Sequence, residues 1–136
     1  MKRDDYRRLF PIQTRWNDND VYGHVNNVVY YAYFDTVINE LLICEGGLDI
    51  QQGPVIGLCV ESQCAFTAPA AYPDVLEAGL RIAKVGNSSV VYEIGIFKKD
   101  APESCAHGRF VHVFVDRTTR RPVPLPAPLR AALEAI

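Results

Sequence analysis

The hydrophobic positions of the chain form one dense early segment, followed by several shorter alternating ones. Residues 28–45, VVYYAYFDTVINELLICE, are apolar or aromatic on every side at first and stop at Gly46-Gly47. A helix that is apolar all round is a buried helix, and glycine is common just past a helix end. Polar side chains recur at helical spacing only in the second half, as at Asp35 and Asn39. The segment therefore predicts a long buried helix, although its β-branched and aromatic residues also allow a strand over the first six positions.

The remaining apolar positions alternate with polar ones, as in strands. Residues 8–16 contain Pro11, which suits an edge strand better than a central one. In the last strand segment three alternating valines share one face, and His112 points to the other. Four further strands are predicted over residues 54–69, 74–86, 88–99 and 103–116, and a short helix over residues 124–136.

These elements predict an α+β fold. Successive strands joined by hairpins form an antiparallel sheet, and the helix is segregated from them in the sequence. We expect a sheet of five or six strands wrapped around the long central helix. The 136 residues are the size of one domain, so residues 1–136 are expected to fold as a single unit. One small sheet cannot cover such a helix on all sides, so a partner subunit is expected to cover the rest.

Composition and charge narrow the classes of partner. Hydrophobic residues make up 49% and charged residues 22% of the chain, which is typical of a globular protein. The net charge of −2 predicts no nucleic-acid partner, because such a partner normally requires a basic patch. No uninterrupted apolar stretch reaches the roughly 18 residues of a membrane helix, so no membrane partner is expected.

The cysteines and the first residues bear on metal binding and location. The four cysteines form no CxxC pair and match no zinc spacing, so no metal site is expected. The opening residues, MKRDDYRR, lead into no apolar signal core. A protein that is not exported keeps its thiols reduced, and we predict a cytoplasmic location.

A polar loop, RWNDNDVYGHVNN at residues 15–27, joins the first strand to the predicted helix. With the aromatic start of that helix it resembles the signature of the 4-hydroxybenzoyl-CoA thioesterase-like family, which has the hotdog fold. That signature pairs a D-x-D-x-x-G-H-V-N-N loop with an aromatic-rich helix. Residues 108–126 are similar to the last strand and tail of the same family, so the resemblance covers most of the chain. It implies a single hotdog thioesterase domain that hydrolyses an acyl-CoA.

The loop also resembles the HVNN region of plant acyl-carrier-protein thioesterases, which share the fold. In those enzymes an asparagine usually stands two residues after the acidic residue, where this chain has Tyr22. The departure argues against transferring the full catalytic set of the plant enzymes to this chain.

The resemblance to the 4-hydroxybenzoyl type implies that Asp20 is the catalytic carboxylate. A carboxylate can attack a thioester carbonyl directly or activate a water that does, and a thiolate leaves without a strong general acid. The carbonyl oxygen gains charge in the reaction, and backbone N–H groups at a helix N-terminus can stabilise it. The helix predicted to start near Asn27 follows Asp20 closely in the chain, which keeps the two near each other.

The other polar residues of the loop each have a structural and a functional interpretation. Asp18 is expected to be a turn or capping residue. Gly23 permits a tight turn or close approach of the substrate. His24 either shapes the loop or contacts the thioester, and no second histidine or cysteine stands at ligand spacing. Asn26 and Asn27 are good helix caps, and one of them is a candidate for a hydrogen bond to the substrate.

The resulting hypothesis is an acyl-CoA thioesterase without a cofactor, in which Asp20 acts with assistance from His24 and Asn27. We expect a homodimer, or a tetramer of two dimers. Candidate substrate contacts are Tyr22, Gly23, Asn26, Tyr30 and the turn residues Ser88 and Ser89. Candidates for binding the coenzyme A phosphates are Arg81, Lys84, Lys98, Lys99 and Arg109.

Several alternatives stay open at the level of the sequence. An acyl-carrier-protein thioesterase would use the same loop on a protein-bound substrate. A hotdog hydratase or dehydratase needs a histidine paired with an acid, and the histidines other than His24 are His107 and His112, far along the chain. A non-catalytic acyl-thioester-binding protein, or the partner subunit of another enzyme, would keep the pocket without the reaction. The aromatic residues suit aryl and fatty acyl groups equally, so they do not identify the acyl group.

Overall fold

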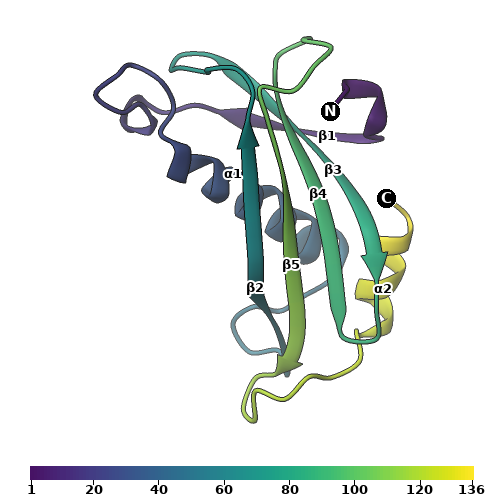
Figure 1. The fold of residues 1–136 in the computed structure, drawn as a ribbon. Coiled ribbons are helices and arrows are strands. Elements are labelled where there is room, and N and C mark those ends of the chain that lie inside the picture. The colour runs from purple at the N-terminus through teal and green to yellow at the C-terminus, as the bar shows by residue number, and fades with distance from the viewer.

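Five strands form one sheet in the order β1-β3-β4-β5-β2 in the computed structural model, which describes residues 1–136. Every neighbouring pair in this sheet is antiparallel. The predicted α+β class is therefore confirmed, with five strands as the observed number. The elements are β1 (Arg8–Gln13), α1 (Asn27–Glu40), β2 (Val55–Phe66), β3 (Val75–Val85), β4 (Ser89–Lys98), β5 (Ala106–Asp116) and α2 (Ala127–Glu134) (Figure 1).

The helix predicted after the polar loop is present, and the alternative of a strand there is wrong. α1 continues from Leu41 to Glu45 as a π-helical turn with Gly46 as its C-cap, and Gly47 follows at φ +68°. Glycine adopts that φ without a steric penalty, so the double glycine ends the helix as predicted. The buried residues of α1 are Tyr30, Tyr33, Phe34, Val37 and Ile38.

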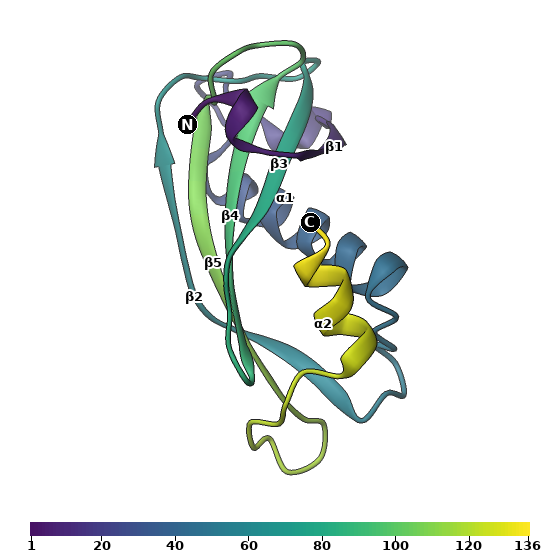
Figure 2. The ribbon, with the colours of Figure 1, turned by 90° about the vertical axis from the view of Figure 1, so that its right-hand side faces the viewer.

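The first turns of α1 are not buried on every side, contrary to the prediction from their composition. Val28 keeps 61% of its surface exposed, and Ala32 is exposed as well. Both helices lie on the same face of the sheet (Figure 2), so one sheet covers only the side of α1 that faces it. The predicted polar stripe, with Asp35 and Glu40, faces solvent.

The core lies between the sheet and the two helices. α2 contacts β3 and the π-helical turn, and it buries Leu129 and Leu133 there. No helix in the chain has the length and apolar character needed to cross a membrane. One face of β4 is fully buried and carries Val90, Tyr92, Ile94 and Ile96 at alternating positions.

On β5 the side that faces the core carries the histidine. Phe110, His112 and Phe114 are buried, whereas Val111 on the opposite face is half-buried. The Tyr92 hydroxyl of β4 lies 3.1 Å from His112 Nδ1, so the buried imidazole has a polar partner inside the core. Both faces of this strand are rich in apolar residues, and the larger aromatic side chains fill the space beneath the helices.

The two edge strands differ in length and exposure. β1 carries Pro11 at the edge predicted for it, and the longer β2 has twelve residues that are mostly exposed. The register between β2 and β5 shifts between Cys59 and Glu61, so Val60 is an extra residue in a β-bulge. Odd-numbered residues of β2 face the helix side before the bulge, and even-numbered residues, including Phe66, face it afterwards.

Candidate active site

The loop between β1 and α1 contains a fully buried aspartate, Asp18. Its carboxylate accepts hydrogen bonds from Tyr33 Oη at 2.8 Å and from the backbone N–H, Nε and Nη2 of Arg15 at 2.8, 3.1 and 3.0 Å. Burial alone would raise the pKa of Asp18, but these hydrogen bonds outweigh it and hold the pKa below its usual range. The Asp18 carbonyl oxygen also accepts the Asn26 N–H at 2.8 Å. Asp18 therefore anchors the loop to α1, in agreement with the structural role predicted for it.

The second aspartate, Asp20, is only partly buried and folds back on its own turn. Its Oδ1 accepts the backbone N–H of Tyr22 at 2.8 Å and that of His24 at 3.5 Å, while Oδ2 makes no hydrogen bond. The Asp20 N–H donates to the His24 carbonyl oxygen at 2.8 Å. Gly23 completes the turn at φ +82°, where any side chain would be strained. The carboxylate is thus oriented through one oxygen, and the other oxygen is available for chemistry.

The first turn of α1 offers an unpaired backbone donor. Asn26 is the N-cap, and its Oδ1 accepts the Val28 N–H at 3.2 Å. The Asn27 N–H, one position earlier, has no hydrogen-bond acceptor in the chain. Unpaired N–H groups at a helix N-terminus carry partial positive charge and attract developing negative charge. Asn26 is therefore the cap, and Asn27 is the asparagine that borders the open space.

A pocket of about 440 Å³ opens beside this turn and contains Asp20, His24, Asn27 and Tyr30. Four of the residues predicted for the site are therefore brought together. The Tyr30 ring packs edge-on against Phe66 at the end of β2, with ring centroids 5.3 Å apart. The rest of the lining is Val25 from the loop and Thr67, Ala68 and Pro69 from the segment after β2.

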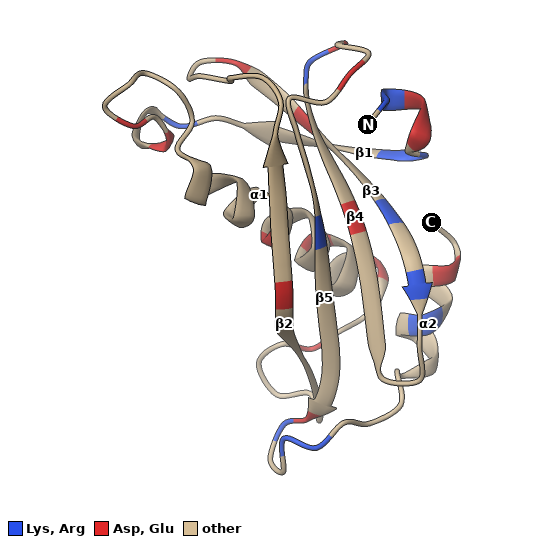
Figure 3. Cartoon of the chain, viewed as in Figure 1, with Lys and Arg blue, Asp and Glu red and all other residues tan.

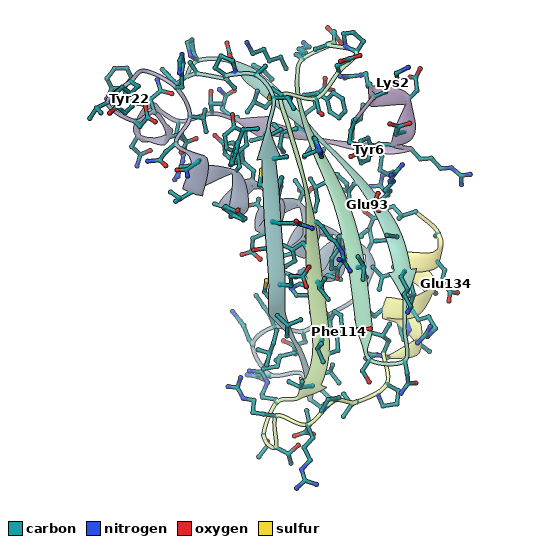
Figure 4. All side chains as sticks on the ribbon, in the orientation of Figure 1. Lys2, Tyr6, Tyr22, Glu93, Phe114 and Glu134 are labelled. Carbon is teal, nitrogen blue, oxygen red and sulfur yellow. The ribbon has the colours of Figure 1, made fainter.

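Other predicted substrate contacts lie outside this pocket. Tyr22 is 83% exposed at the tip of the loop, pointing away from the sheet (Figure 4). Ser88 and Ser89 lie at the start of β4, whereas the pocket adjoins the strand's other end, where Thr67 N–H bonds to the carbonyl oxygen of Cys105. A strand of this length spans about 30 Å, so a single chain does not bring these serines to Asp20. None of the candidate phosphate-binding cations lines the pocket either.

The two other histidines do not line the Asp20 pocket. His112 is buried against Tyr92, and His107 lines a different cavity. Within the pocket, Asp20 bonds to the backbone of His24 and not to its imidazole. The acid–histidine pair that a hydratase would need is not formed in this chain.

Two contributions to the site were missed from the sequence. Tyr33 belongs to the segment predicted as a buried helix, yet its hydroxyl donates a hydrogen bond to the Asp18 carboxylate. Residues 66–69 supply much of the pocket wall although they carry no motif. Their only signal is the position of this segment between two predicted strands.

Known proteins share the fold and the sequence family of this chain. A family model described as the thioesterase-like superfamily matches residues 14–133. The PA5185 protein of Pseudomonas aeruginosa is 58% identical, with a TM-score of 0.97 over 98% of this chain and 94% of its own. The PA2801 protein of the same organism is 27% identical, with a TM-score of 0.84 over 92% of this chain and 96% of its own. No curated protein sequence matches the chain.

A more distant structure shares the fold. Slr0204 of Synechocystis, a 1,4-dihydroxy-2-naphthoyl-CoA thioesterase, is 21% identical, with a TM-score of 0.84 over 94% of this chain and 96% of its own. The family model extends from the loop that holds Asp18 and Asp20 to the last turns of α2. The resemblance noted in the sequence is thereby confirmed: the chain belongs to the thioesterase-like superfamily and is a thioester hydrolase.

Proposed function

We propose that the chain is an acyl-CoA thioesterase, which hydrolyses an acyl-CoA to the free acid and coenzyme A. One observation carries the proposal. The Asp20 side chain, with its Oδ2 atom unbonded, and Asn27, with its N–H unpaired, line the same pocket. The carboxylate can supply a nucleophile or a base, and the N–H can stabilise the charge that develops on the carbonyl oxygen.

The reaction then follows one of two routes. In the first, Asp20 takes a proton from a water whose oxygen attacks the carbonyl carbon. In the second, Oδ2 attacks that carbon, and water later hydrolyses the mixed anhydride. Both routes break the C–S bond, consume one water, and release a thiolate that takes up a proton. Asn27 N–H, at the positive end of α1, holds the oxyanion in either case.

Asp20 is the better candidate than Asp18 because its carboxylate is accessible and incompletely bonded. The four donors on Asp18 occupy both of its oxygens inside the core. His24 borders the same pocket as Asp20 and is exposed, so we assign it to contact with the thioester. Tyr30 and Phe66 form an aromatic wall that suits an aryl or a fatty acyl group.

A second copy of the chain is part of the same proposal. Long unpaired edge strands are normally covered, and β2 exposes most of its twelve residues. Phe66 lines the pocket yet remains 49% exposed. Val28 of α1, which follows the pocket residue Asn27 in the chain, is exposed as well. Pairing of β2 with β2 of a partner would extend the sheet, cover Phe66 and enclose α1 as the central helix. Pairing of such dimers into a tetramer, and the cytoplasmic location, stay predictions from the sequence.

Coenzyme A is preferred over acyl carrier protein as the carrier. The related Slr0204 acts on a CoA thioester, and no lysine or arginine lines the Asp20 pocket to attract an acidic carrier protein. The main alternative is a protein that binds an acyl thioester without hydrolysing it.

The test is thiol release from short, long and aromatic acyl-CoAs by the wild type and Asp20→Asn. We expect the variant to lose about 1,000-fold in kcat/KM, because the amide is neither a base nor a nucleophile. Asp49→Asn is a matched control, since Asp49 Oδ1 also accepts two backbone N–H groups in a turn, at 3.1 Å each, but lies outside the pocket.

Three outcomes would contradict the proposal. Full activity in Asp20→Asn would remove Asp20 from the reaction. Tight binding of acyl-CoA without turnover by the wild type would instead identify a binding protein, and turnover only on acyl carrier protein would change the substrate.

A further inference from the structure

The face of the sheet opposite α1 and α2 holds a tyrosine laid across two glycines. A Cβ atom on Gly79 would come within 2.5 Å of Tyr6 Cγ, and one on Gly95 would come within 2.9 Å of Tyr6 Oη. Gly79 and Gly95 are cross-strand neighbours on β3 and β4, so their missing side chains form the bed in which the ring lies. Tyr6 is consequently 94% buried, being 6% exposed, although it packs on an outer face of the molecule.

The phenol hydroxyl ends next to a histidine, and neither group has a partner. Gly95, which touches the Tyr6 hydroxyl end, pairs in register with His107 of β5. Tyr6 Oη and His107 Nδ1 are both buried and both lack a hydrogen bond. Buried polar groups without a partner are uncommon in folded proteins, and each one calls for an explanation. Burial raises the pKa of Tyr6 to about 12, so the hydroxyl keeps its proton at neutral pH.

Both side chains line one cavity of about 430 Å³, large enough for a small organic molecule. The charged side chains that line it are Arg81, Glu93 and Arg109. Arg81 donates from Nε to Glu93 Oε2 at 2.6 Å, whereas Arg109 makes a single 3.4 Å contact with Glu61. Arg109 therefore retains most of its N–H donors.

The placement of these charges can be followed in the figures. Blue segments on β3 and β5 flank a red segment on β4 (Figure 3), in the row in which Glu93 pairs with Arg81 and Arg109. Tyr6 and Glu93 lie close to each other over the face of β4 that is turned away from α1 (Figure 4). The cavity thus combines the Tyr6 hydroxyl and the His107 ring with the guanidinium groups of Arg81 and Arg109.

We propose that this cavity, on the outer face of the sheet, binds the oxyanion group of a small molecule, a carboxylate or a phosphate. The Tyr6 hydroxyl and the His107 ring donate to one end of the oxyanion, and Arg109 donates to the other. Guanidinium and neutral N–H or O–H donors together are the usual partners of such groups.

The oxyanion cavity is separate from the thioester pocket but shares a strand with it. Gln63 and Ala65 of β2 line the cavity, whereas Phe66, the next residue, lines the pocket with Asp20. A ligand in the cavity therefore sits behind the wall of the thioester pocket. Binding at the cavity does not require hydrolysis at Asp20, so the two proposals stand or fall separately.

The probes are sodium acetate, sodium succinate and inorganic phosphate, added to the full chain at constant ionic strength and followed by isothermal titration calorimetry. We expect saturable binding of at least one anion by the wild type and by Asp20→Asn. Tyr6→Phe keeps the ring on its glycine bed but removes the donor, and we expect it to weaken binding about tenfold. Arg109→Gln should weaken it by at least as much, and Tyr72→Phe, which removes a hydroxyl outside the cavity, should not.

A preference for acetate or succinate indicates a carboxylic acid ligand, and a preference for phosphate indicates a phosphate-bearing one. Either result supports the proposed site. Thermal unfolding of Tyr6→Phe should show no loss of stability, because the hydroxyl it removes has no partner. Binding that survives both Tyr6→Phe and Arg109→Gln would overturn the proposal. An absence of binding by all three anions would also overturn it. If Arg109→Glu then reduces the mass of the assembly, another copy of the chain covers this face instead of a small molecule.

Discussion

Two halves of a single loop use the same residue type in opposite ways. Residues 15–19 bury Asp18 completely and surround its carboxylate with donors from Arg15 and Tyr33. Residues 20–27 leave Asp20 partly exposed, with one oxygen fixed by its own turn and the other unbonded. A carboxylate whose oxygens are all occupied is a structural anion, whereas one held through a single oxygen remains reactive.

The buried half of the loop positions the reactive half. Asp18 ties the loop to α1 through Tyr33, and its carbonyl oxygen positions Asn26, the residue that caps the helix. The unpaired Asn27 N–H and the Asp20 carboxylate thus have their relative positions set by a buried hydrogen-bond network.

The largest effect is expected when the anchor is removed. Asp18→Ala leaves the Tyr33 hydroxyl buried without a partner and should lower the free energy of unfolding by about 3 to 4 kcal/mol. Urea unfolding followed by circular dichroism measures this change. Asp49→Ala, at an exposed turn, is the control and should cost less than about 1 kcal/mol. Equal urea midpoints for the two variants would show that Asp18 is no anchor.

A second interior polar group should give a pH dependence distinct from that of Asp18. Burial lowers the pKa of His112 to about 4, while an unfolded histidine has a pKa of about 6.5. Between these pH values the unfolded chain binds a proton at His112 and the folded chain does not. The contribution of neutral His112 to the free energy of unfolding is therefore fully present above about pH 6.5 and is lost as the pH falls toward 4. The total loss is about 3 kcal/mol.

His112→Gln should flatten the stability curve between about pH 4 and 6.5. Asp18→Asn should act at lower pH, because the depressed pKa of Asp18 contributes stability that is lost only below the ordinary value of 3.8. Urea unfolding at a series of pH values tests both. A slope that persists between pH 4 and 6.5 in His112→Gln would assign it to another group.

Lengthening the reactive carboxylate separates its charge from its position. Asp20→Glu keeps the negative charge but moves it by one methylene, which removes the turn geometry that orients Oδ1 toward the Tyr22 N–H. We expect a loss of about 100-fold in kcat with little change in unfolding. Steady-state kinetics and thermal unfolding of the same preparation provide both numbers. Wild-type kcat in this variant would mean that charge alone suffices.

The smallest effect is expected at the junction of the two halves. Asn26→Ala removes the side-chain oxygen that accepts the Val28 N–H and should lower the free energy of unfolding by about 1 kcal/mol. Asn26→Ser offers another capping oxygen and should restore most of that loss. If alanine and serine are equivalent in unfolding experiments, the cap does not contribute to the start of α1.

Much of the fold could be predicted because its signals are local. The apolar run that ends at Gly46-Gly47 predicted α1, and the alternation of β4 predicted its buried face. On β5 the alternation of side chains predicted a strand correctly. The alternation does not show which face is buried when phenylalanines occupy one side and valines the other. The exposed side of α1 was missed for a similar reason, since composition alone does not show what covers a helix.

The candidate site likewise has a part that the sequence predicts and a part that it does not. Asp20, His24, Asn27 and Tyr30 are close in sequence, so the pocket they share could be anticipated. The bond between Tyr33 and Asp18 depends on where the loop packs on the helix, and the wall at residues 66–69 comes from a strand at the opposite edge of the sheet from β1. Contacts of this kind depend on strand order and register, which no local pattern records.

The bulge at Val60 determines which side of the sheet each later residue of β2 faces, and this strand separates the two cavities. Because β2 counts one residue more than β5 there, Phe66 turns toward Asp20, while Gln63 and Ala65 turn toward Tyr6. If β2 instead paired in regular alternation through Val60, every later position would face the opposite side and the two sets would be exchanged. An aromatic ring would then enter the polar cavity and an amide would face the acyl group, so the strand's phase, and not only its composition, determines what each side of the sheet can bind.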